Sequence, residues 1–157
     1  MGLFDKVFNK QKEEPSSTQA MDNSIEDIDG ASLLDKHEKG LLDDVSFLRA
    51  FGKVMIYYST PFGDHKDGGS RLFALPANDD TAYLPVFSSS SRTMEFYEKV
   101  GRCGYLIIEG TFASFLETTK SINEGGAPVK LGAIIDPDYY GVTINANALD
   151  AVIDLIK

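Results

Sequence analysis

The second half of the chain alternates short apolar runs with helical patterns, and this alternation constrains the fold most strongly. Residues 83–157 contain an apolar strand ending at Phe87, a serine run, a helix, a strand, a second helix, another strand at 130–136 and a closing helix. Glycine and proline interrupt the pattern, most clearly at residues 125–128. Such a unit buries its apolar faces when helices pack on a sheet.

The first half extends the same pattern. The spacing of Leu41, Val45 and Leu48 predicts a helix over residues 41–51, and the apolar and aromatic run 53–58 predicts a strand. Before the helix that follows Phe87, the sequence predicts a polar loop at 62–69 and then an antiparallel hairpin of strands 70–75 and 81–87. We expect an α+β fold, with a mixed sheet of about five to six strands covered by helices.

The remaining predicted elements lie between residues 89 and 157. Strands are predicted at residues 105–108, 130–136 and 141–144. Serine at 89–91, Thr111 and Asn145 or Asn147 are the residue types that cap helices at their N-termini. The predicted helices therefore begin after these residues.

Composition divides the chain into three parts. Residues 1–10 form a short amphipathic segment, and residues 32–157 form the α+β domain. Residues 11–31 are polar, with Met21, Ile25 and Ile28 as scattered apolar positions. So little apolar surface does not offset an ordering cost of ~1 to 2 kcal/mol per residue, which predicts a disordered linker.

Charge and cysteine content exclude some partners and locations. Twenty-four acidic and fifteen basic residues give a net charge of -9, which disfavours nucleic-acid binding because phosphates attract clustered Lys and Arg. Cys103 is the single cysteine, so the chain forms no internal disulfide. The N-terminus lacks a signal-peptide pattern, and no apolar run reaches the ~20 residues that span a bilayer. We expect a cytoplasmic protein, with peripheral membrane contact as a further expectation.

Residues 40–157 resemble the N-terminal domain of the bacterial SseB family, the enhanced serine sensitivity or type III secretion SseB-like proteins. The resemblance is carried by the helix at 40–51, the element Leu84-Pro85-Val86-Phe87-Ser88, the helix at 111–122 and the turn Ile135-Asp136-Pro137. At Asp136 the family commonly has Asn. The resemblance implies an α+β fold and a bacterial cytosolic protein, and it brings no catalytic residues to this chain.

The residues themselves do not form a catalytic motif. His37, His65 and Cys103 are too few and too scattered for a typical metal site, and the cluster Asp64-His65-Lys66-Asp67 is typical of a solvated loop. The serines at 88–91 lack the Gly-x-Ser-x-Gly elbow of a nucleophilic serine. We therefore predict a non-enzymatic protein without a cofactor or a metal.

The family-motif residues form the first candidate surface and have two interpretations. They are Pro85, Phe87, Ser88, Asp136 and Pro137. In the architectural interpretation Phe87 fills the core and Pro85 prevents pairing along one strand edge. In the functional interpretation Leu84, Pro85, Phe87 and the serines form an open lip that receives a peptide or a small polar ligand.

The N-terminal segment is the second candidate surface. Leu3, Phe4, Val7 and Phe8 share one face of a short helix, with Lys6 and Lys10 at its margin. About eight helical residues rise only ~12 Å, enough to lie on a membrane surface and too little to cross it. This pattern predicts a docking peptide for a membrane or a partner's groove. The alternatives are a frayed terminus or a helix that folds back onto its own domain.

Together these features predict a binding or adaptor module with a protein partner. The alternative is a regulatory domain that senses an amino acid or another small polar metabolite near residues 88–91 and the turn at Asp136 and Pro137.

Overall fold

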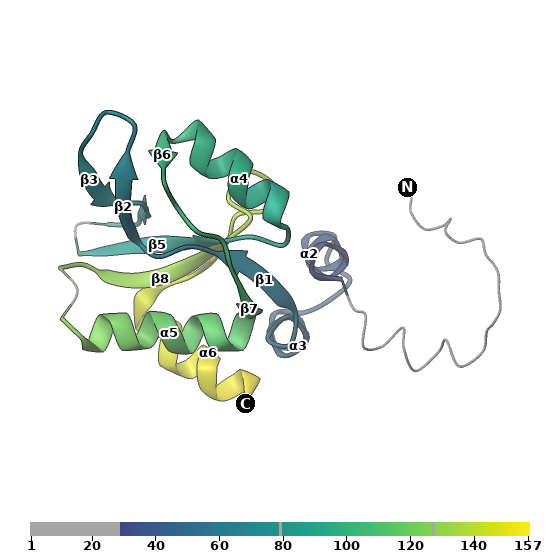
Figure 1. Cartoon of the computed structure of the whole chain (residues 1–157). Helices are drawn as coiled ribbons and strands as arrows, with labels where there is room; N and C mark the ends of the chain where they lie inside the picture. The colour runs from purple at the N-terminus through teal and green to yellow at the C-terminus, as the bar shows by residue number, and fades with distance from the viewer. Residues whose placement is uncertain (1–28, 79, 127) are drawn as a thin grey trace, which may run out of the picture.

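The computed structural model describes residues 29–78, 80–126 and 128–157. Its helices are α2 (Gly30–Glu38), α3 (Asp44–Phe51), α4 (Ser90–Lys99), α5 (Phe112–Glu124) and α6 (Leu149–Ile156), with the 3-10 turn η1 (Ala146–Ala148) before α6. Its strands are β1 (Met55–Tyr58), β2 (Phe62–His65), β3 (Ser70–Leu72), β4 (Leu75–Pro76), β5 (Thr81–Val86), β6 (Arg102–Cys103), β7 (Ile108–Thr111), β8 (Lys130–Ile135) and β9 (Val142–Ile144). The predicted α+β class is confirmed (Figure 1).

A mixed sheet forms the centre of the fold. Its four-stranded part has the order β4-β5-β8-β9, in which β5 and β8 are parallel and the outer pairs are antiparallel. A bridge between Tyr57 and Phe87 joins the antiparallel pair β1-β7 to the end of β5. Strands β4 and β1 therefore occupy successive stretches of the same edge of β5.

Pro85 lies between these two stretches. Tyr83 pairs with β4 and Phe87 pairs with Tyr57, whereas Pro85 has no partner on this edge among the described residues. Backbone groups alternate in direction along a strand, so the missing N–H of Pro85 faces the interval between β4 and β1. Pro85 is buried. The structure therefore agrees with the architectural interpretation of this residue.

The two faces of this sheet contact different apolar clusters. Helices α5 and α6 pack on one face of the sheet, with α3 at the end of that face, and α4 lies beyond the other face (Figure 1). Successive side chains of a strand point to opposite faces, so Val86 joins the larger cluster and Phe87 the smaller one. The largest fully buried side chains of the larger cluster are Leu34, Phe47, Phe51, Ile56, Leu84, Val86, Phe112, Phe115, Leu116 and Ile135.

A second, smaller sheet has the order β3-β2-β6. The polar loop predicted at 62–69 was wrong, because residues 62–65 form β2 and pair with both β3 and β6. Gly68 turns the chain between β2 and β3 with a φ of 94°, which the missing side chain permits. The strand predicted at 105–108 lies instead at Ile108–Thr111, and Leu106 is 81% exposed.

The domain begins earlier than the sequence predicted. Helix α2 starts at Gly30, inside the expected linker, because the Asp29 side chain caps it by accepting a hydrogen bond from the Ala31 N–H. The helix then buries Leu33 and Leu34 in the core. The helix predicted at 41–51 is observed as α3, which Asp43 caps. The predicted cap Thr111 is confirmed, and of the three serines predicted as alternatives at 89–91 the cap is Ser89; each side chain accepts a hydrogen bond from the N–H three residues later.

Candidate functional site

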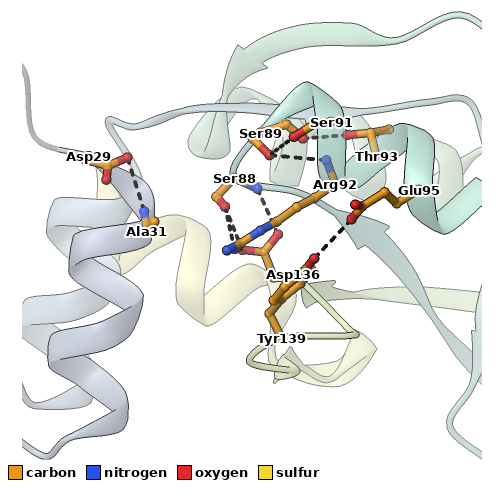
Figure 2. Close-up of polar contacts among 10 residues, drawn as sticks. All are labelled: Asp29, Ala31, Ser88, Ser89, Ser91, Arg92, Thr93, Glu95, Asp136 and Tyr139. Atoms are coloured by element: carbon orange, nitrogen blue, oxygen red, sulfur yellow. Dashed lines mark hydrogen bonds and ion pairs between the residues drawn. The ribbon is translucent and has the colours of Figure 1, made fainter. Parts of the chain in front are cut away.

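The ends of the two parallel strands bring Ser88 and Asp136 together. Ser88 follows β5 and Asp136 follows β8, and the carboxyl ends of parallel strands meet at one edge of a sheet. The Asp136 Oδ1 atom accepts from the Ser88 N–H at 2.9 Å, and its Oδ2 atom accepts from the Ser88 hydroxyl at 2.7 Å (Figure 2). The guanidinium of Arg92, from the first turn of α4, donates to the same Oδ2 atom at 2.8 Å.

The backbone of Asp136 makes a tight turn. Its φ is 46°, in the left-handed region that Asp and Asn tolerate better than other residues with a side chain. The Asp136 carbonyl accepts from the N–H groups of Tyr139, Tyr140 and Gly141, and its own N–H donates to Val86. This geometry explains why either Asp or Asn suits this position of the turn.

Aromatic rings surround the cation of this cluster. The Arg92 guanidinium lies 3.9 Å from the centre of the Tyr139 ring, and the Tyr139 hydroxyl donates to Glu95 at 3.0 Å (Figure 2). This hydrogen bond and the negative charge of Glu95 raise the pKa of Tyr139. Because Asp136 is fully buried, its charge is balanced by Arg92 and not by water.

The structure thus unites part of the predicted family-motif surface. Ser88 and Asp136 bond to each other, and Pro137 is half-buried in the turn that follows. Pro85 is buried and Phe87 is only 2% exposed, so these two residues do not line an open lip. Both oxygens of Asp136 already accept hydrogen bonds, so this cluster joins β5, β8 and α4 through its own polar groups.

A groove lies at another part of the domain, between the α2–α3 pair and the β9–η1–α6 segment. Its volume is about 300 Å³. The apolar side chains that line it come from α3, β9, η1 and α6; they are Phe47, Leu48, Val142, Ile144, Ala148 and Val152. Two polar residues complete this side: Thr143 of β9 and Asn145, which follows β9.

The other side of the groove carries an acidic group. His37, at the end of α2, stacks on Phe47 with ring centres 4.5 Å apart, and its Nε2 atom lies 2.8 Å from an oxygen of Asp44. The side chain of Asp44 is 87% exposed. Next to it, hydrogen bonds from the backbone and side chain of Ser46 lower the pKa of Asp43. The rim therefore presents a carboxylate above an apolar floor.

Strand β9 leaves a sheet edge beside this groove. It is the last strand of the order β4-β5-β8-β9, and no strand of the described residues pairs with its outer edge. At the opposite end of the sheet, β4 contains Pro76, which lacks an N–H for pairing. Of these two ends, β9 is the one with Val, Thr and Ile and without a proline.

A second hollow, of about 380 Å³, lies between β3–β4 and α4. Its two cations are already paired: Arg71 contacts Asp67 at 2.6 Å, and Lys99 contacts Asp138 at 2.6 Å. Nearby, the buried guanidinium of Arg102 lies against the rings of Phe73, Tyr97 and Tyr105, and its Nη2 atom donates to the Thr60 hydroxyl and the Phe62 carbonyl. The groove beside β9 differs from this hollow in that the strand edge next to it contains no proline.

The sequence did not predict this groove. Its residues lie between positions 37 and 152, and one of the helices that form it, α2, was not predicted. From the sequence, His37 was considered only as a potential metal ligand. The other candidate surface, Leu3, Phe4, Val7 and Phe8, lies outside the described residues.

Comparison of the chain with protein-family models, with curated proteins and with solved structures gave no match. The resemblance to SseB N-terminal domains therefore stays a prediction. Within the described ranges, no helix has the length and apolar character needed to cross a bilayer. The same part of the chain holds no group of three or more His, Cys, Asp or Glu side chains placed to bind a metal.

Proposed function

We propose that this protein is a non-enzymatic binding or adaptor module that receives a segment of a protein partner in the groove beside β9. The observation that carries this proposal is the combination of an open apolar floor with an unpaired strand edge. Apolar grooves of this kind accept the apolar face of an amphipathic helix. The polar cluster at Asp136 supports the fold and leaves the groove as the binding surface.

The charge of the domain favours a basic partner segment. Residues 29–157 contain eighteen acidic and twelve basic side chains, and Asp44 stands exposed at the rim of the groove. Opposite charges across an interface speed encounter and fix orientation. The partner segment is therefore an amphipathic helix with apolar residues on one face and Lys or Arg beside them.

A small polar metabolite at Ser88 and Asp136 has less support. Such a ligand needs hydrogen-bonding groups that are free, whereas the Asp136 carboxylate already accepts from the Ser88 N–H, the Ser88 hydroxyl and Arg92. A ligand at this position has to displace one of these donors. That displacement leaves a buried charge without its partner, which costs free energy.

A display library of amphipathic helical peptides tests the proposal. Peptides are selected on the full chain and then measured on two variants, Thr143→Lys in the groove and Thr118→Lys on the exposed side of α5. Both variants make the same chemical change, and only the first places a cation in the groove. We expect Thr143→Lys to weaken the selected peptides about tenfold or more, equivalent to about 1.4 kcal/mol, and Thr118→Lys to leave them unchanged. Failure to enrich peptides, or equal binding to both variants, contradicts the proposal.

A further inference from the structure

We infer that the groove beside β9 binds the amphipathic N-terminal segment of the same chain, residues 3–8. This inference rests on the proposed function, because it names a ligand for the same groove. It places an internal competitor within reach of the partner's site. The docked segment then occupies the groove until a partner displaces it.

The chemistry of the segment matches that of the groove. Leu3, Phe4, Val7 and Phe8 share one helical face, which suits a floor formed by residues such as Phe47 and Val152. The segment is also basic where the rim is acidic: residues 1–12 contain three Lys and one Asp, whereas Asp44 is exposed beside the groove. The apolar match and the charge match both favour this segment over the other apolar residues outside the described ranges.

The connection along the chain is long enough for this contact. Helix α2 begins at Gly30 and reaches the groove with His37 near its end. A nine-residue helix is only ~14 Å long at 1.5 Å per residue. Twenty residues, most of them polar, lie between Phe8 and Asp29, and a random-coil chain of that length has an end-to-end distance of about 25 Å. The segment therefore reaches the groove without any displacement of α2.

The covalent connection also favours binding within one chain. A linker of this length gives a tethered segment an effective concentration in the millimolar range, so even a weak contact is populated. The segment is too short to be a stable helix alone in water. Burial of its apolar face in the groove supplies the stabilisation that the isolated segment lacks. A partner then binds more weakly to the intact chain than to a chain whose segment cannot dock.

Paramagnetic relaxation in the full-length protein tests this contact. A nitroxide is attached at residue 2 in a Gly2→Cys, Cys103→Ser chain enriched in ¹⁵N, which leaves one thiol for labelling. We expect selective broadening of the amide signals of Thr143, Asn145 and Ala148 in the groove. The amide of Gly68, in the turn between β2 and β3, serves as the distant reference. Absence of broadening in the groove, or equal broadening at Gly68, overturns the inference.

Two controls separate docking from random encounters. The variant Phe4→Ser, Phe8→Ser removes two apolar contacts without a change in charge, and it is expected to abolish the broadening. A matched variant, Met21→Ser, Ile25→Ser, removes two apolar side chains from the linker and is expected to retain it. The opposite pattern contradicts docking through residues 3–8.

A mixed sample identifies the chain that supplies the segment. Spin-labelled chain without ¹⁵N is combined with unlabelled ¹⁵N-enriched chain, and we expect no broadening in the groove of the latter. Broadening there assigns the contact to a second copy and overturns the intramolecular inference. If the segment fails to dock while selected peptides still bind in a manner sensitive to Thr143→Lys, only this inference fails and the proposed function stands.

Discussion

Asp136 shows how one buried carboxylate holds three elements of this domain together. It follows β8, accepts two hydrogen bonds from Ser88 after β5 and one from Arg92 of α4, and is fully buried. Its neighbour in sequence, Asp138, makes an ion pair with Lys99 at the surface, where its side chain is 42% exposed. The two aspartates of one turn therefore differ in burial and in what their removal leaves unpaired.

The first prediction concerns this difference. We expect Asp136→Ala to lower the free energy of unfolding by roughly 3 to 5 kcal/mol, because it removes the charge partner of Arg92 and the acceptor of the Ser88 N–H. Asp136→Asn is expected to cost less, since Asn tolerates the left-handed backbone and still accepts a hydrogen bond. Urea denaturation at neutral pH measures both. Asp138→Ala is the control, with an expected loss of ~1 kcal/mol or less; equal losses for Asp136→Ala and Asp138→Ala would contradict this account.

Tyr97 gives a second prediction at the residue scale, which concerns alkaline pH. Burial raises the pKa of the Tyr97 hydroxyl to about 12, against a smaller opposing effect of the Arg102 charge. An unfolded tyrosine has a pKa of about 10, so the folded state holds its proton more tightly. The resulting stabilisation is complete below about pH 10 and is lost as the pH rises from about 10 to about 12.

We expect Tyr97→Phe to remove this decline, whose size is about 3 kcal/mol for a shift of about two pKa units. Near pH 7 the same change is expected to be neutral or slightly stabilising, because the hydroxyl is buried and has no hydrogen-bond partner among the described residues. Denaturation curves of both proteins across this pH range are the measurement. An identical alkaline decline in the two proteins would show that another group is responsible.

At the scale of elements, β8 packs closely against β9 and η1, which form one wall of the groove. Gly132 of β8 has no side chain, and a methyl group in its place would overlap the carbonyl oxygen of Ile144 and lie 2.8 Å from the backbone nitrogen of Ala146. The obstacle is backbone and not a flexible side chain, so β9 or η1 has to move. The position of the groove wall therefore depends on this glycine.

Gly132→Ala is expected to lower the free energy of unfolding by about 1 to 3 kcal/mol and to weaken peptide binding in the groove. The matched change Gly110→Ala, in β7, adds a methyl whose nearest neighbour is the Ser114 hydroxyl at 3.5 Å, an ordinary contact. We expect that variant to keep both stability and binding. Thermal unfolding and peptide titration of the two variants test the comparison, and retained binding in Gly132→Ala would argue against β9 as the groove wall.

The elements that the sequence predicted well are those with local signals. Ser89 and Thr111 were predictable as caps because a cap is read from a few neighbouring residues, and β5 and β8 were predictable as continuous apolar runs. Strands β2 and β6 were missed because they are short and largely polar, and because their pairing with each other joins residues far apart in the sequence. Their pairing comes from the tertiary fold and leaves no local periodicity.

The candidate sites also differ in how far the sequence predicts them. The contact of Ser88 with Asp136 follows from parallel pairing of β5 and β8, and the sequence predicted both strands without predicting which strands would be neighbours. The groove depends on side chains from four separate segments. No spacing rule relates residues such as His37 and Val152, so their convergence was visible only in the structure.

At the scale of the whole molecule, the described residues form a folded domain with a closed polar cluster and an open apolar groove. The polar cluster fixes the ends of the central strands, and the groove receives an amphipathic segment. The chain itself carries such a segment at residues 3–8. Binding of a partner and binding of this segment are therefore expected to compete.

Titration of a fluorescently labelled peptide with the sequence of residues 1–12 is the most direct test of the groove. We predict saturable binding to the full chain carrying Phe4→Ser and Phe8→Ser, and weaker binding to the natural chain, whose own segment competes. Addition of Thr143→Lys to the first protein is predicted to weaken binding about tenfold or more, and addition of Thr118→Lys to leave it unchanged. Absent binding contradicts the docking of residues 3–8, and binding that Thr143→Lys leaves unaltered contradicts the central claim that this groove is the docking site.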